Sequence, residues 1–345
     1  MKLDTWRISG HAFHFGRHGL GQEETSVHLT SDSLFAALAS SLASAASEPV
    51  FSEWISHFTG GRPVLVLSSA FPCLASVRFF PTPLRHSSQG EANPLAAKTL
   101  KKVRYISEAT FKEMLGGAAL SLLIQKGLLL QNGQFLISPS EFEGLPASLR
   151  NPDLEIYSIV QRPRVTIGRA KADSNLYHTG QVLFSEDCGL WFAVRWLQNE
   201  PALAQQLENM LKMLGDAGLG GERSSGSGQT EFSKMGELEL PDPSGRTWVA
   251  LSRYLPAEDE TPALSSKEAA YAIESVGGWI YSHGVKSERR RSINMLVEGS
   301  VLGRLDKDVP GQMADVQPVY ENDAQPVGHA VWRSGFALAV GFQNT

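Results

Sequence analysis

The chain has 345 residues, of which 42% are hydrophobic and 19% are charged, so it can bury a core and is not a wholly disordered protein. Its 31 lysines and arginines stand against 36 aspartates and glutamates, and the net charge of −5 argues against a protein that coats long nucleic acids. Cys73 and Cys188 are its two cysteines, which excludes a disulfide framework and a zinc site made of four cysteines.

The N-terminal residues predict a strand and no targeting segment. Residues 1–16 include Asp4 and alternate apolar with polar side chains, which is typical of a strand from Leu3 towards Phe15 and unlike a signal peptide. The charge-free stretch 33–47 is too short and too rich in serine to span a bilayer. We therefore expect a cytoplasmic protein that does not enter a membrane.

An amphipathic helix is predicted after this strand. Thr30-Ser31-Asp32 offers N-cap chemistry, and apolar residues then recur at helical spacing on one face: Leu34, Phe35, Leu38 and Leu42. A short β-type run follows at residues 64–67.

Residues from about 80 to 175 are predicted to be inserted segments. Pro81 and Pro83 end regular structure at the start of this region. Four basic residues with no acidic residue among them follow a polar loop: Lys98, Lys101, Lys102 and Arg104. Ser107 is the expected cap of a short helix that runs to Leu115, and many turn residues predict irregular structure over 131–155.

The last part of the first half is predicted as two strands, a helix and a strand. The strands cover 182–184 and 190–196, and the helix begins at Pro201 and ends with Gly215 as its left-handed cap. The final strand covers 230–240. Residues 241–247 predict a linker, which divides the chain into a domain at 1–240 and one at 241–345. The second domain has predicted strands near 294–297 and 330–342.

The glycine-rich loop at 215–228 is the most informative segment. Glycines allow positive φ and close backbone approach, so consecutive N–H groups can point at an anion, and Arg223 adds a guanidinium. The segment lacks the Gly-Lys-Ser/Thr of a Walker A loop, and Arg223 stands at the third glycine of a Rossmann pattern. A flexible connection between a helix and a strand is the alternative.

A basic run follows the insertion and is the second candidate site. Arg162, Arg164, Arg169 and Lys171 lie within ten residues with no acidic residue between Gln161 and Ala172. On an extended ribbon the arginines would share a face along a phosphate backbone, and Tyr157 or Tyr177 could stack on a base. A solvated hairpin edge is the alternative.

No motif for catalysis or for a metal is present. His11 and His14 would point to opposite sides of a strand, which suits neither a metal cage nor a catalytic pair. We expect no catalytic residue, no metal and no cofactor.

The predicted order is strand, helix, inserted region, strands, helix, glycine loop and strand, which is an expanded βαββαβ unit. On this order and on the segment Gly218-Leu-Gly-Gly-Glu-Arg-Ser-Ser-Gly-Ser-Gly228, the chain resembles the RAMP superfamily of CRISPR proteins. More narrowly, it resembles subunit four of the type III-A Csm interference complex. Four further segments agree with that family: 30–38, 80–83, 164–177 and 329–331.

The resemblance implies an α+β fold made of two ferredoxin-like, RRM-like βαββαβ domains, the first with a large insertion. It implies a non-catalytic RNA-binding subunit of an antiviral ribonucleoprotein that holds the 5′ handle of CRISPR RNA. The expected protein partners are the large polymerase-type subunit and a backbone RAMP subunit of the same complex.

The resemblance also assigns residues. The handle would be cradled by Gly218, Leu219, Gly220, Gly221, Arg223, Ser224, Ser225 and Gly226. The run with Arg162, Arg164, Arg169 and Lys171 would form a thumb-like hairpin, and His14 and Ser31 complete the expected RNA-binding residues. Glu222 stands where relatives often carry a basic residue.

Two other functions stay open from the sequence. A RAMP-type endoribonuclease that processes precursor RNA would need a general base such as His14. Relatives of that kind carry their glycine loop close to the C-terminus, whereas 117 residues follow Gly228 here. The equivalent subunit of a type III-B complex is the third possibility.

Overall fold

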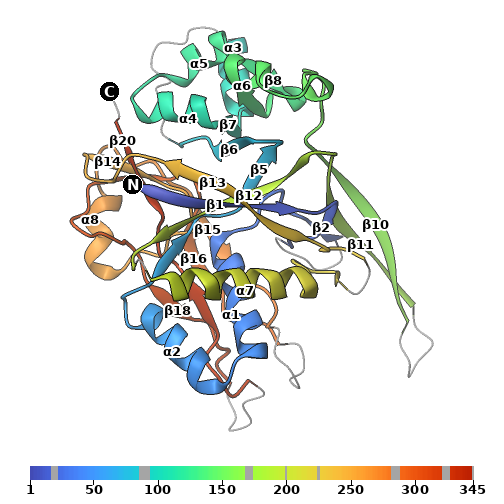
Figure 1. The fold of residues 1–345 in the computed structure, drawn as a ribbon, viewed down its shortest axis with the longest axis vertical. Coiled ribbons are helices and arrows are strands. Elements are labelled where there is room, and N and C mark those ends of the chain that lie inside the picture. Colours follow the sequence, from blue (N-terminus) through green and yellow to red (C-terminus); the bar gives the residue numbers. More distant parts are fainter. Residues whose placement is uncertain are drawn as a thin grey trace.

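The computed structural model describes residues 1–16, 22–84, 94–167, 174–198, 200–223, 226–280, 288–320 and 327–343. Its largest sheet has nine strands and crosses the middle of the molecule (Figure 1). The strand order is β13-β1-β12-β5-β6-β7-β9-β8, with β4 also paired to β12. These strands are β1 (Lys2–Ser9), β4 (Leu65–Leu67), β5 (Phe71–Leu74), β6 (Val77–Pro81), β7 (Tyr105–Ser107), β8 (Leu128–Leu130), β9 (Phe135–Ile137), β12 (Cys188–Trp196) and β13 (Glu231–Glu239).

The strands around β1 are antiparallel to their neighbours, whereas β7 and β9 at the far end of the sheet are parallel. β1 lies between β12 and β13 and is antiparallel to both, and β12 is antiparallel to β4 and β5. Helix α1 (Ser31–Ala45) connects β1 with β4 by way of α2 (Glu48–Thr59), and α7 (Pro201–Ala217) connects β12 with β13. The three helices lie together on one side of the sheet (Figure 1).

The predicted helix at Thr30 is confirmed. Thr30 is the N-cap of α1, and the four apolar residues of its predicted face are all buried. The prediction that Gly215 ends the later helix is wrong, because α7 continues to Ala217 and Gly218 takes the positive φ of 81° at its C-cap. Gly215 has a packing reason instead, since a Cβ there would lie 3.2 Å from the carbonyl oxygen of Thr230.

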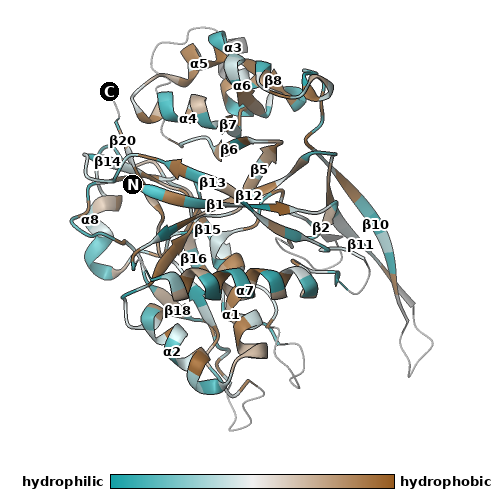
Figure 2. Ribbon diagram, viewed as in Figure 1, coloured by the Kyte–Doolittle hydropathy of each residue, from teal (hydrophilic) through white to brown (hydrophobic). Residues whose placement is uncertain are grey.

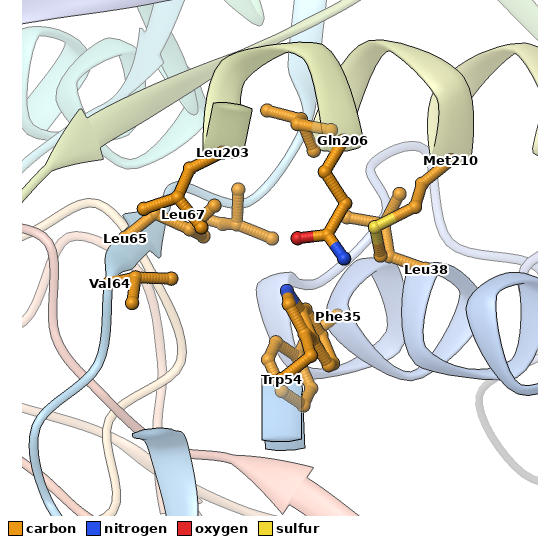
Figure 3. Close-up of a pocket in the computed structure, with 10 residues that line it drawn as sticks. Phe35, Leu38, Trp54, Val64, Leu65, Leu67, Leu203, Gln206 and Met210 are labelled. Atoms are coloured by element: carbon orange, nitrogen blue, oxygen red, sulfur yellow. The ribbon is translucent and has the colours of Figure 1, made fainter. Parts of the chain in front are cut away.

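One apolar core extends through both halves of the chain. Hydrophobic and hydrophilic residues alternate along many of the strands and helices (Figure 2). A small pocket lies in this core where α1, α2 and α7 meet β4 (Figure 3). Its lining is Phe35, Leu38, Trp54, Val64, Leu65, Leu67, Leu203, Gln206, Leu207 and Met210. This lining holds no titratable or nucleophilic side chain, so the pocket is a gap in core packing and offers no catalytic chemistry. None of the helices within the described ranges is long and apolar enough to cross a membrane.

The insertion builds a cap at one end of the molecule (Figure 1). Its helices are α3 (Pro94–Lys102), α4 (Glu108–Leu115), α5 (Leu120–Lys126) and α6 (Pro139–Glu143). The helix predicted after Ser107 is confirmed as α4. The prediction of irregular structure over 131–155 is wrong in part, because β9 and α6 lie there; β9 is held by β7 and β8, which a local pattern does not show.

A second sheet carries a long hairpin that projects from the body (Figure 1). The hairpin consists of β10 (Tyr157–Ile167) and β11 (Ser174–Phe184). β2 (Ala12–Phe13) pairs with the root of β11, and β3 (Gln22–Glu23) pairs with β11 further along. The hairpin is therefore fastened to the N-terminal strand region.

The C-terminal half contains mostly short strands. β14 (Thr247–Ala250) lies between β17 (Val301–Gly303) and β20 (Ala339–Phe342). Two pairs accompany this sheet: β15 (Ile273–Val276) with β16 (Ile293–Leu296), and β18 (Met313–Asp315) with β19 (Trp332–Ser334). Among the described residues after 240, α8 (Thr261–Leu264) is the one α-helix, so a second βαββαβ unit stays a prediction.

Candidate nucleic-acid interface

The glycine-rich loop follows α7 and is fastened to the N-terminal strand region by main-chain hydrogen bonds. The N–H of Gly221 donates to the carbonyl of His14 at 2.9 Å, and the N–H of Gly228 donates to Ala12 at 2.8 Å. Leu219 donates to Gly228 across the loop at 2.8 Å, and its side chain is buried in the core. The two described ends of the loop, residues 218–221 and 226–228, are thus held in place by the main chain rather than forming a flexible connection.

The glycines of this loop have two different roles. Gly220 and Gly221 lie against His14: a Cβ on Gly220 would be 2.6 Å from the His14 carbonyl oxygen, and one on Gly221 would be 2.8 Å from the imidazole. Gly228 has a φ of 81° and a Cβ there would run into the carbonyl of Leu219. Gly226 differs, because it is exposed, has a φ of 86° and has open space where a Cβ would stand. Gly226 is the position where a ligand can approach the backbone closely.

Arg223 and Glu222 are the charged residues of the loop, and Arg223 hydrogen-bonds to the main chain next to it. Nη1 of Arg223 donates to the carbonyls of Ala217 at 3.3 Å and Gly218 at 3.5 Å, so this exposed guanidinium also caps the C-terminus of α7. Glu222 adopts a positive φ of 56°. Ser224 and Ser225, which the resemblance assigns to the cradle, lie outside the described residues.

The arginines of the hairpin share one face of β10. Arg162 stands opposite Thr179 and Arg164 opposite Tyr177. Arg162 is exposed, and Arg164 lies with its Nε 3.8 Å from a carboxylate oxygen of Glu222 in the glycine loop. Of the proposed stacking residues, Tyr157 is buried and Tyr177 is half-buried. Arg169 and Lys171 lie outside the described residues.

Gln181 joins the hairpin to the loop and was not predicted. Its amide nitrogen donates to the hydroxyl of Ser227, and the side chain is only 2% exposed. Its Oε1 and the hydroxyl of Thr179 are buried, and neither has a hydrogen-bond partner among the residues that the structure describes. A buried polar atom without a hydrogen bond lowers the stability of the fold, because it has lost its contact with water. These two atoms are therefore candidate contacts to a ligand. The signal in the sequence is a glutamine directly before the apolar run 182–184.

The structure places the two remaining predicted residues differently. His14 is 4% exposed beneath the loop, with its Nδ1 2.7 Å from the carbonyl oxygen of Gly180. Ser31 is also 4% exposed, but its partners belong to another region: its hydroxyl accepts from the N–H of Arg253 at 2.9 Å, and its N–H donates to Ser69 at 2.8 Å. Ser31 lies at a buried junction between the halves of the chain.

Charged groups pair inside this junction. Glu298 lies 3.2 Å from the guanidinium of Arg253 and 3.6 Å from His28, and it accepts a hydrogen bond from Ser69. Burial opposes the ionisation of Glu298, but the charge of Arg253 and the contact with His28 outweigh it and hold its pKa below the ordinary value. Arg253 also pairs with Glu274. The charged side chains of the junction therefore form ion pairs with one another.

Three or more His, Cys, Asp or Glu side chains that could hold a metal ion do not come together anywhere in the described ranges. The chemistry of the loop and hairpin is that of hydrogen-bond donors, exposed backbone and cations, which suits the phosphates and bases of a single-stranded nucleic acid.

Comparison with known proteins finds relatives among CRISPR proteins. Residues 244–342 match the family model of the CRISPR Csm4 C-terminal domain. The chain is 26% identical to the CRISPR protein Csm4 of Thermococcus onnurineus over 293 residues, which is 82% of this chain and 83% of that protein. It is 24% identical to Csm4 of Methanocaldococcus jannaschii over 345 aligned positions, with coverages of 90% and 87%.

Solved structures share the fold. A chain of the Csm3–Csm4 subcomplex of a type III-A CRISPR-Cas interference complex superposes with a TM-score of 0.66 at 19% identity, covering 99% of this chain and all of that one. A chain of the Csm1–Csm4 cassette bound to pppApA gives 0.56 at 16% identity, covering 100% and 99%. The predicted resemblance is confirmed over most of the sequence, and the chain is a Csm4-like CRISPR protein.

Proposed function

We propose that the chain is a non-catalytic, RNA-binding subunit of a type III-A CRISPR effector complex in the cytoplasm. It holds the 5′ handle of CRISPR RNA and anchors the large polymerase-type subunit. The observation that carries this proposal is that the glycine loop and the arginine face of the hairpin form one surface, joined by the Gln181–Ser227 hydrogen bond and the Arg164–Glu222 pair. We call residues 218–228 together with the arginine face of β10 and β11 the handle surface.

The handle surface has the parts that a splayed RNA strand requires. Gly226 lets a phosphate approach the backbone, and Arg162 supplies an exposed cation. Gln181 and Thr179 supply buried polar atoms that no described residue hydrogen-bonds.

The architecture behind the proposal is ferredoxin-like in the first half. The order β13-β1-β12-β5 with antiparallel neighbours and helices on one side supports a βαββαβ unit. We also propose that the chain divides near residue 241; the Csm4 C-terminal family match from residue 244 supports this boundary.

The proposed protein partners follow from the relatives. The matched structures contain Csm4 together with Csm3 in one case and with Csm1 in the other. We propose that this chain likewise meets a backbone subunit of the Csm3 kind and a large subunit of the Csm1 kind.

The buried position of His14 favours RNA binding over RNA cleavage as the function of this chain. A general base must reach the proton it removes, whereas this imidazole is buried beneath Gly221 with Nδ1 at the Gly180 carbonyl. The endoribonuclease alternative would therefore need a rearranged loop.

The test is RNA binding by the complex assembled with this chain, measured against salt. Four phosphate contacts give a slope of log K against log salt of about −3 for a single strand. We expect the Gly226→Ala variant to weaken binding about ten-fold. The Gly61→Ala variant is the matched control, because Gly61 also has a positive φ of 73° and open space at its Cβ position. A flat salt response, or equal binding of RNA without the handle, would contradict the proposal.

A further inference from the structure

The insertion carries a group of basic residues that the handle surface does not use. Lys98, Lys101 and Lys102 lie at positions i, i+3 and i+4 of α3, so they share one side of the helix, and Arg104 is the second residue after the helix. All four side chains are exposed. None of them forms an ion pair with a carboxylate in the part of the chain that the structure describes. We call these four residues the α3 basic face.

This face adjoins the root of the hairpin. The N–H of Arg104 donates to the carbonyl of Gln134 at 2.9 Å, and the side chain of Gln134 accepts from the hydroxyl of Tyr157, the first residue of β10, at 2.7 Å. The turn at Gln131 is also bonded to Tyr157, since its amide donates to the Tyr157 carbonyl at 2.9 Å. Lys102 packs along the same turn, 3.8 Å from where a Cβ on Gly133 would stand.

Helix stability alone does not explain the face. Lys101 and Lys102 stand in the last turn of α3, where cations interact favourably with the helix dipole. Lys98 is a full turn earlier and Arg104 lies beyond the helix, so the dipole accounts for neither. Four neighbouring exposed cations that form no ion pair within the described ranges repel one another and attract an anion with several charges.

We propose that the α3 basic face binds the phosphate backbone of single-stranded RNA that continues from the handle surface past the root of β10. The inference rests on the proposed function and extends its RNA path. Lysine is depleted at protein interfaces, whereas it is a common contact to phosphate, so the composition favours RNA over an acidic protein. Arg162 of β10 and the α3 basic face would then contact the same RNA strand.

The test uses the assembled complex and two RNAs: one that ends with the handle and one that continues beyond it. The Lys98→Gln/Lys101→Gln/Lys102→Gln variant removes three of the cations without touching a buried group. Loss of three phosphate contacts should reduce the magnitude of the salt slope by about 2 for the longer RNA and leave the short RNA unchanged. The Lys112→Gln/Lys212→Gln/Lys267→Gln variant is the control, because it removes the same charge elsewhere.

Three results would overturn the inference. One is an unchanged slope for the longer RNA, and another is an equal loss in the control variant. The third is that the α3 variant releases a protein subunit in size-exclusion chromatography while its RNA slope stays at the wild-type value. In each of these the wild-type complex still selects the handle, so the proposed function survives; wild-type protein that fails to select the handle would contradict both.

Discussion

The buried junction around Ser31 and the handle surface make an instructive pair, because the sequence assigned RNA-binding residues to both. At the junction the charged groups are buried and form ion pairs with one another, as Glu298 does with Arg253, although some of their atoms, such as Nη1 of Arg253, have no hydrogen-bond partner among the described residues. On the handle surface Arg162 is exposed and Gly226 faces open space. The comparison indicates that the junction holds the two halves together and that the handle surface is kept available for a ligand.

The largest expected effect comes from the junction. The Glu298→Gln variant leaves the buried Arg253 with Glu274 as its remaining carboxylate partner, and breaking such a pair costs about 3 kcal/mol of the free energy of unfolding. Chemical denaturation measures this loss. RNA affinity of the folded variant should stay at the wild-type value, and a parallel loss of affinity would break the distinction between the two regions.

The same carboxyl predicts a pH dependence. Its folded pKa is held below the unfolded value of about 4.3, so its contribution is present above that pH and is lost as the pH falls through the folded pKa. Wild-type protein should lose more stability than Glu298→Gln on acidification below about pH 5. Thermal unfolding followed over this range measures it; parallel curves would show that Glu298 is not ionised in the fold.

The next effect is expected at the anchored end of the glycine loop. Gly226→Ala and Gly228→Ala both impose a φ above 80° on an L residue, but only the Cβ of Gly228→Ala runs into the Leu219 carbonyl, so for this variant we expect a loss of about 2 kcal/mol in stability beyond that of Gly226→Ala, together with loss of RNA binding. Gly226→Ala keeps most of the stability while losing affinity. Equal stability losses in the two variants would contradict the division of glycines into packing and ligand-facing positions.

A smaller effect is expected from the exposed arginine of the hairpin. The Arg162→Ala variant should bind handle RNA about five-fold more weakly, because it loses one charge-assisted hydrogen bond worth about 1 kcal/mol of binding free energy. The slope of log K against log salt should become smaller in magnitude by about 0.7. The melting temperature of the variant should not change. Arg304→Ala is the control, since Arg304 is a similarly exposed arginine paired with Asp306. An equal loss of RNA affinity in this control would show that the effect comes from net charge alone.

The smallest effect is expected at Glu222. The Glu222→Gln variant removes a negative charge 3.8 Å from Arg164, so handle RNA should bind about two-fold more tightly, and a partly exposed pair costs under about 1 kcal/mol of stability. Fluorescence anisotropy at low salt measures the change. Weaker binding would indicate that Glu222 instead orients Arg164 for the RNA.

Local patterns in the sequence predicted local structure well. The face of α1 followed from the spacing of Leu34, Phe35, Leu38 and Leu42, because helical periodicity requires no knowledge of distant residues. The end of α7 did not, because both Gly215 and Gly218 could serve as a cap. The choice depends on Thr230, which lies against Gly215 only in the folded chain.

Contacts between distant segments decided the rest of the site. The resemblance assigned Gly218, Gly220, Gly221 and Gly226 to a ligand, and the structure adds a packing requirement at Gly220 and Gly221, because His14 lies against both. Ser31 was assigned to RNA, but its hydroxyl meets the backbone of Arg253, 222 residues away. Gln181 was missed because its partner Ser227 lies on another element.

Hydrogen exchange of the assembled complex with and without handle RNA tests the central claim most directly. The account predicts that RNA slows amide exchange in residues 218–228 and 157–184 and leaves the segments around Ser31 and Glu298 unchanged. Protection confined to the junction, or no protection in the loop and hairpin at saturating RNA, would contradict it.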